Sequence, residues 1–247
     1  MGKIDDNSID LTVTSPPYDN LRTYNNDIDK TRWEHIRKPI ISELYRITKE
    51  WWAVVWVVWD ATINGSETWT SFRQALYFKE IGFNLHDTMI YSKQNPVPQN
   101  HNRYEQAFEY MFVLSKWTPK TLNKKMVACL NVWWRSMWTY YKSDWTIRDA
   151  HKKWQPIKET KPEKNIRTYF VWWAWVWHPA IFPEELAEDH ILSWSNEWDI
   201  VFDPFMWSWT TAKMAKANNR NFIWCEISEE YVQIANKRLA NTTISLF

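Results

Sequence analysis

The chain has 247 residues, of which 45% are hydrophobic and 24% charged, and its formal net charge is +1. This length allows one substantial core, and the composition is ordinary for a globular protein. The most apolar stretch, 51–61, is too short to cross a bilayer, and the two cysteines and six histidines show no metal-ligand spacing. We therefore expect a cytoplasmic protein without membrane association or a bound metal.

Hydrophobic periodicity predicts the elements of the first half of the chain. Apolar residues alternate before a Pro-Pro turn and predict a strand at 9–14. Apolar residues recur every three or four positions at 36–47, which predicts a helix. The continuous apolar run at 53–58 is typical of a strand buried on both faces. We also expect a helix at 70–81 and strands at 85–92 and 107–115.

The end of the chain alternates strands with helices. We expect strands at 199–203 and 221–227, followed by helices at 210–219 and 228–240. Ser228 is a typical N-cap residue, and two glutamates follow it in the first turn of its helix. This alternation predicts a Rossmann-like α/β fold, in which a mostly parallel sheet carries helices on both faces.

Residues 116–167 are strongly basic, with 13 Lys and Arg against 4 Asp and Glu. The aromatic residues Tyr140, Tyr141 and Trp154 lie among these charges. Positive charge mixed with aromatic rings suits contacts to phosphates and stacking on bases or sugars. A solvated loop region is the alternative interpretation.

The chain has only 3 glycines but 21 tryptophans. Average usage would give about 17 glycines. Many tryptophans stand in turn and loop contexts, where they would expose a large apolar area. We assign 17 of them to positions with a glycine-like context: Trp51, Trp52, Trp59, Trp69, Trp117, Trp133, Trp134, Trp138, Trp145, Trp172, Trp173, Trp175, Trp177, Trp198, Trp207, Trp209 and Trp224.

Our hypothesis for this excess is a gene in which UGA encodes glycine and was translated as tryptophan. The remaining residues, Trp33, Trp56, Trp154 and Trp194, are then genuine tryptophans. Deliberate replacement of glycine by tryptophan is the rival explanation. The nucleotide sequence decides between them, because UGG codons at the 17 positions exclude recoding.

Residues 203–211 lie between a predicted strand and a predicted helix. With glycine at 207 and 209, they would form a Gly-Ser-Gly turn that lets the backbone approach a ligand at a helix N-terminus. One strand later, Glu226 stands at a strand end, where an acid can accept the hydroxyls of a ribose. Together these features indicate a nucleoside-bearing cofactor, although a Gly-x-Gly turn alone is weak evidence.

A second motif, Thr14 to Tyr18, has the sequence TSPPY and follows the first predicted strand. Its two prolines favour an extended turn at the carboxyl edge of the sheet. Tyr18 offers a ring for stacking, while Ser15 and the Pro16 carbonyl can accept hydrogen bonds from an amino group. These parts suit a planar base that carries an amino group, and a plain Pro-Pro turn is the alternative.

These motifs resemble those of the amino-methylating DNA methyltransferases. The catalytic motif (D/N/S)-P-P-(Y/F/W) of this family matches Ser15, Pro16, Pro17 and Tyr18. Its cofactor motif, D-P-F-x-G-S-G-T-T, matches at these positions, with tryptophan in place of the two glycines: Asp203, Pro204, Phe205, Trp207, Ser208, Trp209, Thr210 and Thr211. The ribose-binding acid of the family falls on Glu226, and the segment that begins with His178 and Pro179 resembles the motif beside the methionine part of the cofactor.

The order of the motifs, catalytic before cofactor-binding, resembles the permuted beta group of this family. The resemblance implies a catalytic half at 1–115, a target recognition insertion at 116–175 and a cofactor-binding half at 176–247. The group usually has one more strand before the catalytic strand, so we expect Met1 to be an internal methionine of a longer protein.

The resemblance implies methyl transfer from S-adenosylmethionine to the amino nitrogen of a base flipped out of double-stranded DNA. Serine at position 15 is commoner among cytosine-N4 enzymes, so we favour cytosine over adenine. Asp60 is expected near the same pocket or as an ordinary strand-end residue. A homodimer and a companion restriction nuclease are further possible partners. The alternatives are methylation of RNA or a small molecule, and an inactive DNA-binding protein if the tryptophans are real.

Overall fold

The protein is described by a computed structural model that covers residues 1–17, 37–96, 98, 102–129, 158–170, 183–206 and 209–240. The chain divides into two compact units. The smaller unit comprises residues 124–164 and contains an antiparallel pair of strands, β7 (Met126–Ala128) and β8 (Thr160–Pro162). It lies within the range predicted for the insertion, whose boundaries stay a prediction. The larger unit comprises residues 1–123 and 165–247.

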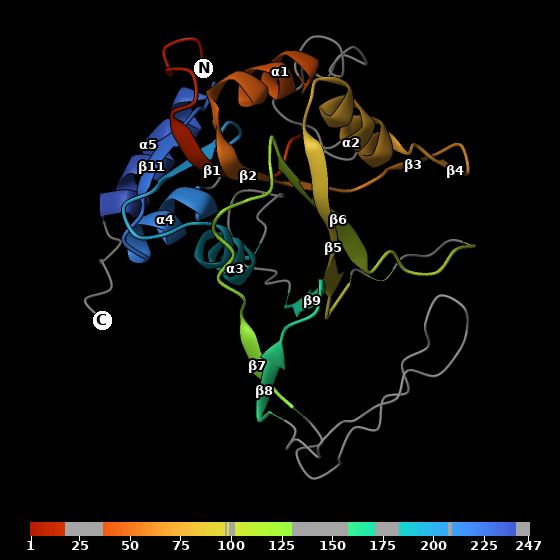
Figure 1. The fold of residues 1–247 in the computed structure, drawn as a ribbon. Coiled ribbons are helices and arrows are strands. Elements are labelled where there is room, and N and C mark those ends of the chain that lie inside the picture. Colours follow the sequence, from red (N-terminus) through yellow and green to blue (C-terminus); the bar gives the residue numbers. More distant parts are fainter. Residues whose placement is uncertain are drawn as a thin grey trace, which may run out of the picture. The chain divides into compact units, whose positions relative to one another are not determined.

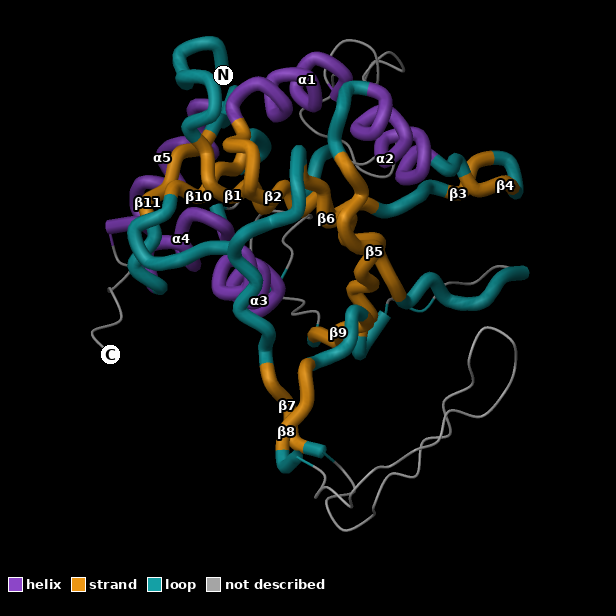
Figure 2. Tube along the Cα trace, viewed as in Figure 1, coloured by secondary structure: helices purple, strands orange, loops and turns teal. Residues whose placement is uncertain are grey.

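A seven-stranded sheet forms the centre of the larger unit, in the order β11-β10-β1-β2-β6-β5-β9 (Figures 1 and 2). Neighbouring strands from β11 to β2 are parallel, whereas β6 is antiparallel to both of its neighbours. A short hairpin of β3 (Thr62–Ile63) and β4 (Ser66–Glu67) follows β2. The strands of the main sheet are β1 (Ile9–Thr14), β2 (Thr48–Val58), β5 (Asn84–Lys93), β6 (Phe108–Ser115), β9 (Ile166–Tyr169), β10 (Ile200–Asp203) and β11 (Asn221–Trp224).

Helices cover both faces of this sheet. One face packs against α1 (Lys38–Ile47) and α2 (Thr70–Glu80), and the opposite face packs against α3 (Glu184–Trp194) and α4 (Thr210–Ala217). Residues of α5 (Glu229–Ala240) join a smaller apolar cluster with α4. The mostly parallel sheet between two layers of helices confirms the predicted Rossmann-like fold.

The fold explains why continuous apolar runs marked the central strands. Residues 53–58 of β2 are all buried. Because side chains alternate along a strand, successive residues pack into the cores on opposite faces of the sheet. Every predicted helix and strand is present, with ends shifted by a few residues. The sequence analysis did not predict α3, β9 or the two small hairpins.

Three tryptophans adopt left-handed backbone conformations, Trp69 with φ 51°, Trp198 with φ 71° and Trp209 with φ 57°. The other non-glycine residues with positive φ in the described part of the chain are asparagines, which tolerate this region. For a bulky L-residue the left-handed conformation costs about 1–2 kcal/mol. All three tryptophans belong to the glycine-like group, so their backbone geometry supports glycine at these positions.

The two described tryptophans outside that group behave differently. Trp56 is fully buried, and its Nε1–H donates to Gln74 Oε1 at 2.8 Å. Trp194 is 4% exposed and packs edge-to-face on His86 with ring centroids 5.5 Å apart. Neither has a positive φ.

We predict that Trp198→Gly stabilises the protein by about 1 kcal/mol, because it relieves left-handed strain at a side chain that is 69% exposed. Trp117→Gly is the matched control, since Trp117 is 56% exposed but lacks a positive φ. Thermal unfolding of both variants measures the difference. Equal effects of the two substitutions would contradict the strain argument.

Candidate active site

The carboxyl ends of β10 and β1 meet at a point where the chain leaves the sheet in opposite directions. These strands are parallel neighbours, with Leu11 opposite Val201 and Thr12 opposite Phe202. From β1 the chain continues to β2 through α1 on one face, and from β10 it continues to β11 through α4 on the other. Such a switch point leaves a crevice outside the strand ends, where α/β proteins bind ligands.

The predicted catalytic motif begins directly at this switch point. Ser15, Pro16 and Pro17 follow Thr14, the last residue of β1, and Pro16 is buried while its two neighbours are half-buried. Tyr18 lies outside the described residues. The predicted Pro-Pro turn therefore leaves the sheet beside the end of β10, next to the predicted cofactor motif.

A buried hydrogen bond joins the two motifs. Thr14 Oγ1 donates to Asp203 Oδ1 at 2.6 Å, across 189 positions of sequence, and Asp203 is 3% exposed. The same oxygen accepts the N–H of Phe205 at 3.0 Å. A second link runs from Thr211 Oγ1 to the carbonyl of Val13 at 3.1 Å. Hydrogen bonds thus link the end of β1 to both sides of the predicted cofactor turn.

Burial raises the pKa of Asp203 to about 6, against an ordinary value of 3.8, because the low-dielectric interior disfavours the charged carboxylate. The hydrogen bond from Thr14 and the Phe205 N–H oppose this shift, while the nearby charge of Glu226 adds to it. Glu226 and Asp203 therefore lie close enough to interact electrostatically. The junction holds an acid whose ionised form depends on the Thr14 hydroxyl.

The remaining predicted cofactor residues are partly described. Pro204 and Thr210 are buried and Phe205 is half-buried, with its ring 6.1 Å from that of Trp56. Glu226 is half-buried just after β11, and its Oε1 accepts the N–H groups of the two following residues at 2.8 and 2.9 Å. Outside the described residues lie Trp207, Ser208, His178 and Pro179.

Trp209 begins α4 as its N-cap residue and makes no capping hydrogen bond with its side chain. Its indole is 1% exposed and packs with Met206, Ala212 and Ala235. The ring therefore fills an apolar cluster beside α5. The strained backbone and the buried ring belong to the same residue, so replacement by glycine would relieve the first and remove the second.

Asp60 acts as a helix cap rather than as a group that points into the crevice. Its Oδ1 accepts the Ser71 N–H at 2.9 Å and the Thr70 hydroxyl at 3.2 Å, and its Oδ2 accepts the Ser71 hydroxyl. These bonds satisfy donors in the first turn of α2. Of the two roles expected for Asp60, the structural one fits its contacts.

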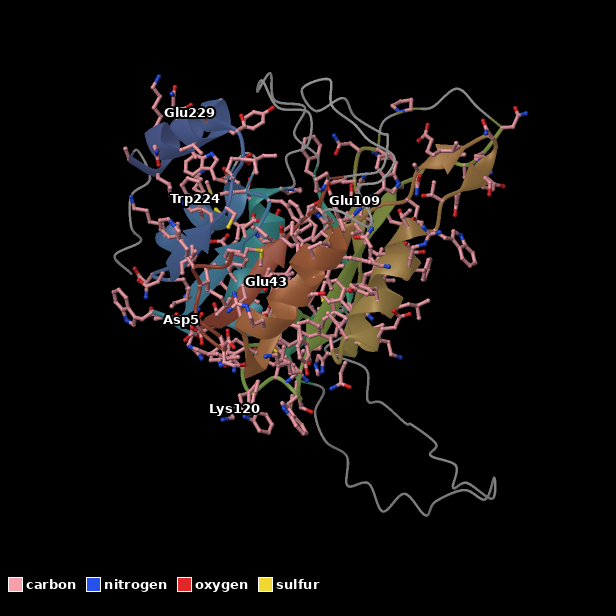
Figure 3. All side chains as sticks on the ribbon, turned by 90° about the horizontal axis from the view of Figure 1, so that it is seen from above. Asp5, Glu43, Glu109, Lys120, Trp224 and Glu229 are labelled. Atoms are coloured by element: carbon pink, nitrogen blue, oxygen red, sulfur yellow. The ribbon has the colours of Figure 1, made fainter. Side chains whose placement is uncertain are left out.

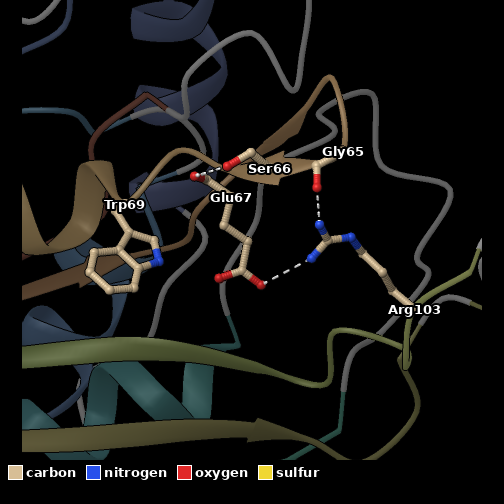
Figure 4. Close-up of a pocket in the computed structure, with 5 residues that line it drawn as sticks. All are labelled: Gly65, Ser66, Glu67, Trp69 and Arg103. Atoms are coloured by element: carbon tan, nitrogen blue, oxygen red, sulfur yellow. Dashed lines mark hydrogen bonds and ion pairs between the residues drawn. The ribbon is translucent and has the colours of Figure 1, made fainter.

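A cavity of about 470 Å³ lies at the β3–β4 hairpin, lined by Gly65, Ser66, Glu67, Trp69 and Arg103 (Figure 4). Arg103 donates to the Gly65 carbonyl, and its Nη1 lies 3.7 Å from Glu67 Oε1. No residue predicted for catalysis or cofactor binding lines this cavity. We therefore place the candidate site at the β1–β10 crevice.

Sequence reasoning missed the contributions of Thr14 and Thr211. A polar residue in an otherwise buried strand was the available signal for Thr14, because buried hydroxyls require partners. Its neighbour on the strand, Thr12, has a buried hydroxyl without a partner, so the signal by itself does not identify which threonine matters. Among the described residues, no group of three or more His, Cys, Asp or Glu could hold a metal ion, and no helix could span a membrane.

Comparison of the sequence with known proteins shows the family of the chain. The profile of the N6/N4 methyltransferase family, described as DNA methylase, matches residues 9–237, which include both motifs. The chain belongs to this DNA methylase family. Over 98% of its length it is 50% identical to the orphan methyltransferase M.BamHII of Bacillus amyloliquefaciens, and the match covers 92% of that protein.

Solved structures share the fold of this methylase at lower identity. The cytosine-N4-specific PvuII DNA methyltransferase superposes with a TM-score of 0.68 at 18% identity, covering 98% of this chain and 89% of the other. M1.HpyAVI, solved as a complex with SAM, gives a TM-score of 0.60 at 24% identity, covering 96% and 90%. The methylase thus has the architecture of the DNA methyltransferases, with helices on both faces of its sheet.

We predict that Thr14→Val costs the methylase about 1–3 kcal/mol of unfolding free energy at pH 8, because it removes a donor from a buried carboxylate. The cost should shrink at pH 5. Asp203 has a raised folded pKa, so its carboxyl group is mostly protonated below about 6 and there needs the donor less.

Thr12→Val is the matched control, because the Thr12 hydroxyl is equally buried on the same strand but has no partner. It should change the unfolding free energy by less than about 0.5 kcal/mol at either pH. Denaturant unfolding at both pH values measures all three proteins. If Thr14→Val lowered the unfolding free energy equally at both pH values, the contribution of this hydrogen bond would not depend on the ionisation of Asp203. That result would contradict the prediction.

Proposed function

We propose that this methylase is a site-specific DNA methyltransferase that transfers a methyl group from S-adenosylmethionine to the N4 amino nitrogen of cytosine. The observation that carries this proposal is the hydrogen bond from Thr14, the residue before Ser15–Pro17, to Asp203, the first residue of the 203–205 turn, at the switch point. A base at one side of the crevice and a methyl donor at the other would then be neighbours. The family and its 50% identical relative support the reaction class.

The residues of the catalytic turn would hold and polarise the amino group. In a free base the nitrogen lone pair is delocalised into the ring, which makes it a poor nucleophile. Hydrogen bonds from the amino group to Ser15 and the Pro16 carbonyl would favour a tetrahedral nitrogen and localise the lone pair. Stacking on Tyr18 would orient the ring. Catalysis would therefore rest on positioning and polarisation.

The backbone at the end of β11 and the start of α4 suits the binding of S-adenosylmethionine. Glu226 stands half-exposed at the end of β11 for the ribose hydroxyls, and α4 begins beside it. When bound, the cofactor supplies an electrophilic methyl group. We assign cofactor binding to the whole predicted set: Asp203, Pro204, Phe205, Trp207, Ser208, Trp209, Thr210, Glu226, His178 and Pro179. The SAM complex of M1.HpyAVI supports a cofactor site in this fold.

Double-stranded DNA is the proposed partner, because the segment 116–167 carries 13 basic residues against 4 acidic ones. The target base would have to leave the helix, since its amino group is otherwise paired and hidden. We keep a homodimer, the cytoplasmic location and the target recognition role of 116–175 as predictions. A companion nuclease is also a prediction, and the 50% identical relative is called an orphan methyltransferase.

We propose glycine as the functional residue at 207 and 209. The φ of 57° at Trp209 supports this, because the cofactor turn then reaches α4 through a conformation that glycine adopts without strain. Codon identity at the 17 glycine-like positions tests the recoding hypothesis. If the tryptophans are real, an inactive DNA-binding protein remains the alternative function.

We predict that the Trp207→Gly, Trp209→Gly double variant binds S-adenosylmethionine at least about tenfold more tightly than the chain that carries both tryptophans. The reason is that glycine leaves room for the cofactor beside the turn. Titration calorimetry measures both affinities. A Trp117→Gly variant controls for a general effect of removing an exposed indole. Equal affinity of the chain that carries both tryptophans and the double variant would refute obstruction by these two side chains.

We predict that DNA from cells expressing the form with glycine at all 17 glycine-like positions contains N4-methylcytosine within one recurrent short sequence. Mass spectrometry of nucleosides identifies the base, and sequencing of modified bases identifies the site. N6-methyladenine in place of N4-methylcytosine would overturn the choice of cytosine. In vitro transfer of labelled methyl groups to RNA but not to duplex DNA would favour the RNA alternative.

A further inference from the structure

A buried ion pair lies at the same edge of the sheet as the catalytic turn. Lys93 Nζ is 2.8 Å from Glu109 Oε1, and their side chains are 15% and 8% exposed. Lys93 ends β5, and Glu109, labelled in Figure 3, is the second residue of β6. Because β6 is antiparallel to β2 and β5, its amino end lies beside their carboxyl ends.

Strand register places this pair in one row with the catalytic turn. Thr14 is opposite Trp56 on β2, Val58 is opposite Tyr110 on β6, and Tyr91 on β5 is opposite Glu109. If each strand is extended by one to three residues beyond these pairs, the row runs from Ser15–Pro17 through position 59 to the ion pair. β1 and β5 are three strand spacings apart, about 14 Å, and the Lys93 side chain extends back to Glu109 on β6, so a nucleobase can bridge the remaining span.

The row also lies on one face of the sheet. Val13, Val57, Met111 and Tyr91 belong to the core cluster under α3 and α4. Because side chains alternate along a strand, residues two positions away along each strand project toward the same side. Lys93 and Glu109 stand at such positions, and Lys93 does contact Trp59, with its Nζ 4.5 Å from the centre of the Trp59 ring. The space above Lys93 therefore already accepts a planar aromatic group.

Fold stability gives little reason for an ion pair here. Removing a lysine and a glutamate from water costs several kcal/mol per ion, and apolar side chains of similar size often replace such pairs without loss. The neighbouring side chains on the same face of the two strands, Tyr91 on β5 and Met111 on β6, are already buried. An ammonium group that is held in one place beside the catalytic turn is instead suited to bind a polar atom of a ligand.

We propose that Lys93, held by Glu109, binds the carbonyl oxygen O2 of the target cytosine, and that the indole of Trp59 occupies the place of that base. The inference rests on the proposed function. The amino group of the base would face Ser15 and the Pro16 carbonyl, while O2, beyond N3 on the same edge of the ring, would face Lys93. Adenine has a C–H group in place of this oxygen, so Lys93 would also contribute to selection of cytosine. Position 59 belongs to the glycine-like group, and glycine there opens the space.

The test compares two DNA duplexes that differ only at the target, one with cytosine and one with an abasic site. The parent protein carries glycine at 59, 207 and 209. Lys93→Met should weaken binding of the cytosine duplex about tenfold and leave binding of the abasic duplex unchanged. Equal weakening for both duplexes would show a structural role for the ion pair and overturn the proposal.

Lys49→Met is the matched control, because Lys49 is also ion-paired, with Asp10 at 2.6 Å, but stands at the amino end of β2. It should not change the ratio of the two affinities. Restoring the indole at position 59 should abolish the preference for cytosine over the abasic site. A retained preference would contradict the role assigned to Trp59.

Methylation by the parent separates failure of this inference from failure of the proposed function. A parent that methylates cytosine in DNA, together with a Lys93→Met variant whose affinity ratio equals that of the parent, would overturn only the inference. A parent that methylates no cytosine would overturn the proposed function and this inference with it.

Discussion

The hydrogen bond from Thr14 to Asp203 holds together two parts of the chain that are 189 positions apart in sequence. Main-chain pairing between β1 and β10 is short, and the bond lies where that pairing ends and the two chains diverge. Without it, a buried carboxylate would lose a partner, and the end of β1 would keep only the bond from Thr211 Oγ1 to the Val13 carbonyl as a side-chain link to the 203–211 segment.

This arrangement explains how the order of motifs can be permuted without harm to the site. The strand before the predicted catalytic motif, β1, comes first in the chain, and the strand before the predicted cofactor motif, β10, comes near its end, yet they are neighbours in the sheet. Chemistry at the strand ends requires only that β1 and β10 be parallel and in register. The basic segment can then be inserted between them, because the chain leaves and re-enters the larger unit at 123 and 165.

The sequence predicted the parts of the fold that have strong local signals. The apolar run of β2 and the spacing of α1 and α4 were sufficient, since buried strands and amphipathic helices impose different periods. The antiparallel direction of β6 could not be read in this way, because the apolar pattern of a strand is the same in both directions. Likewise, α3 was missed because its segment was interpreted through the proline-rich motif that precedes it.

At the site, the sequence predicted which residues stand at the strand ends but not what their side chains contact. Asp203 was assigned to the cofactor from its motif, whereas the structure shows bonds from Thr14 and the Phe205 N–H. Asp60 stands at an equivalent strand end and caps α2. Both are acids after apolar strands, so only three-dimensional contacts distinguish them.

The glycine-like tryptophans join local strain to function. Left-handed backbone geometry at Trp69 and Trp209 starts α2 and α4, and glycine adopts this geometry without the clash of a Cβ. The two helices follow the hairpin after β2 and the cofactor turn after β10, at the edge where the site lies. Glycine at these two positions would therefore relieve the strain at the start of both helices.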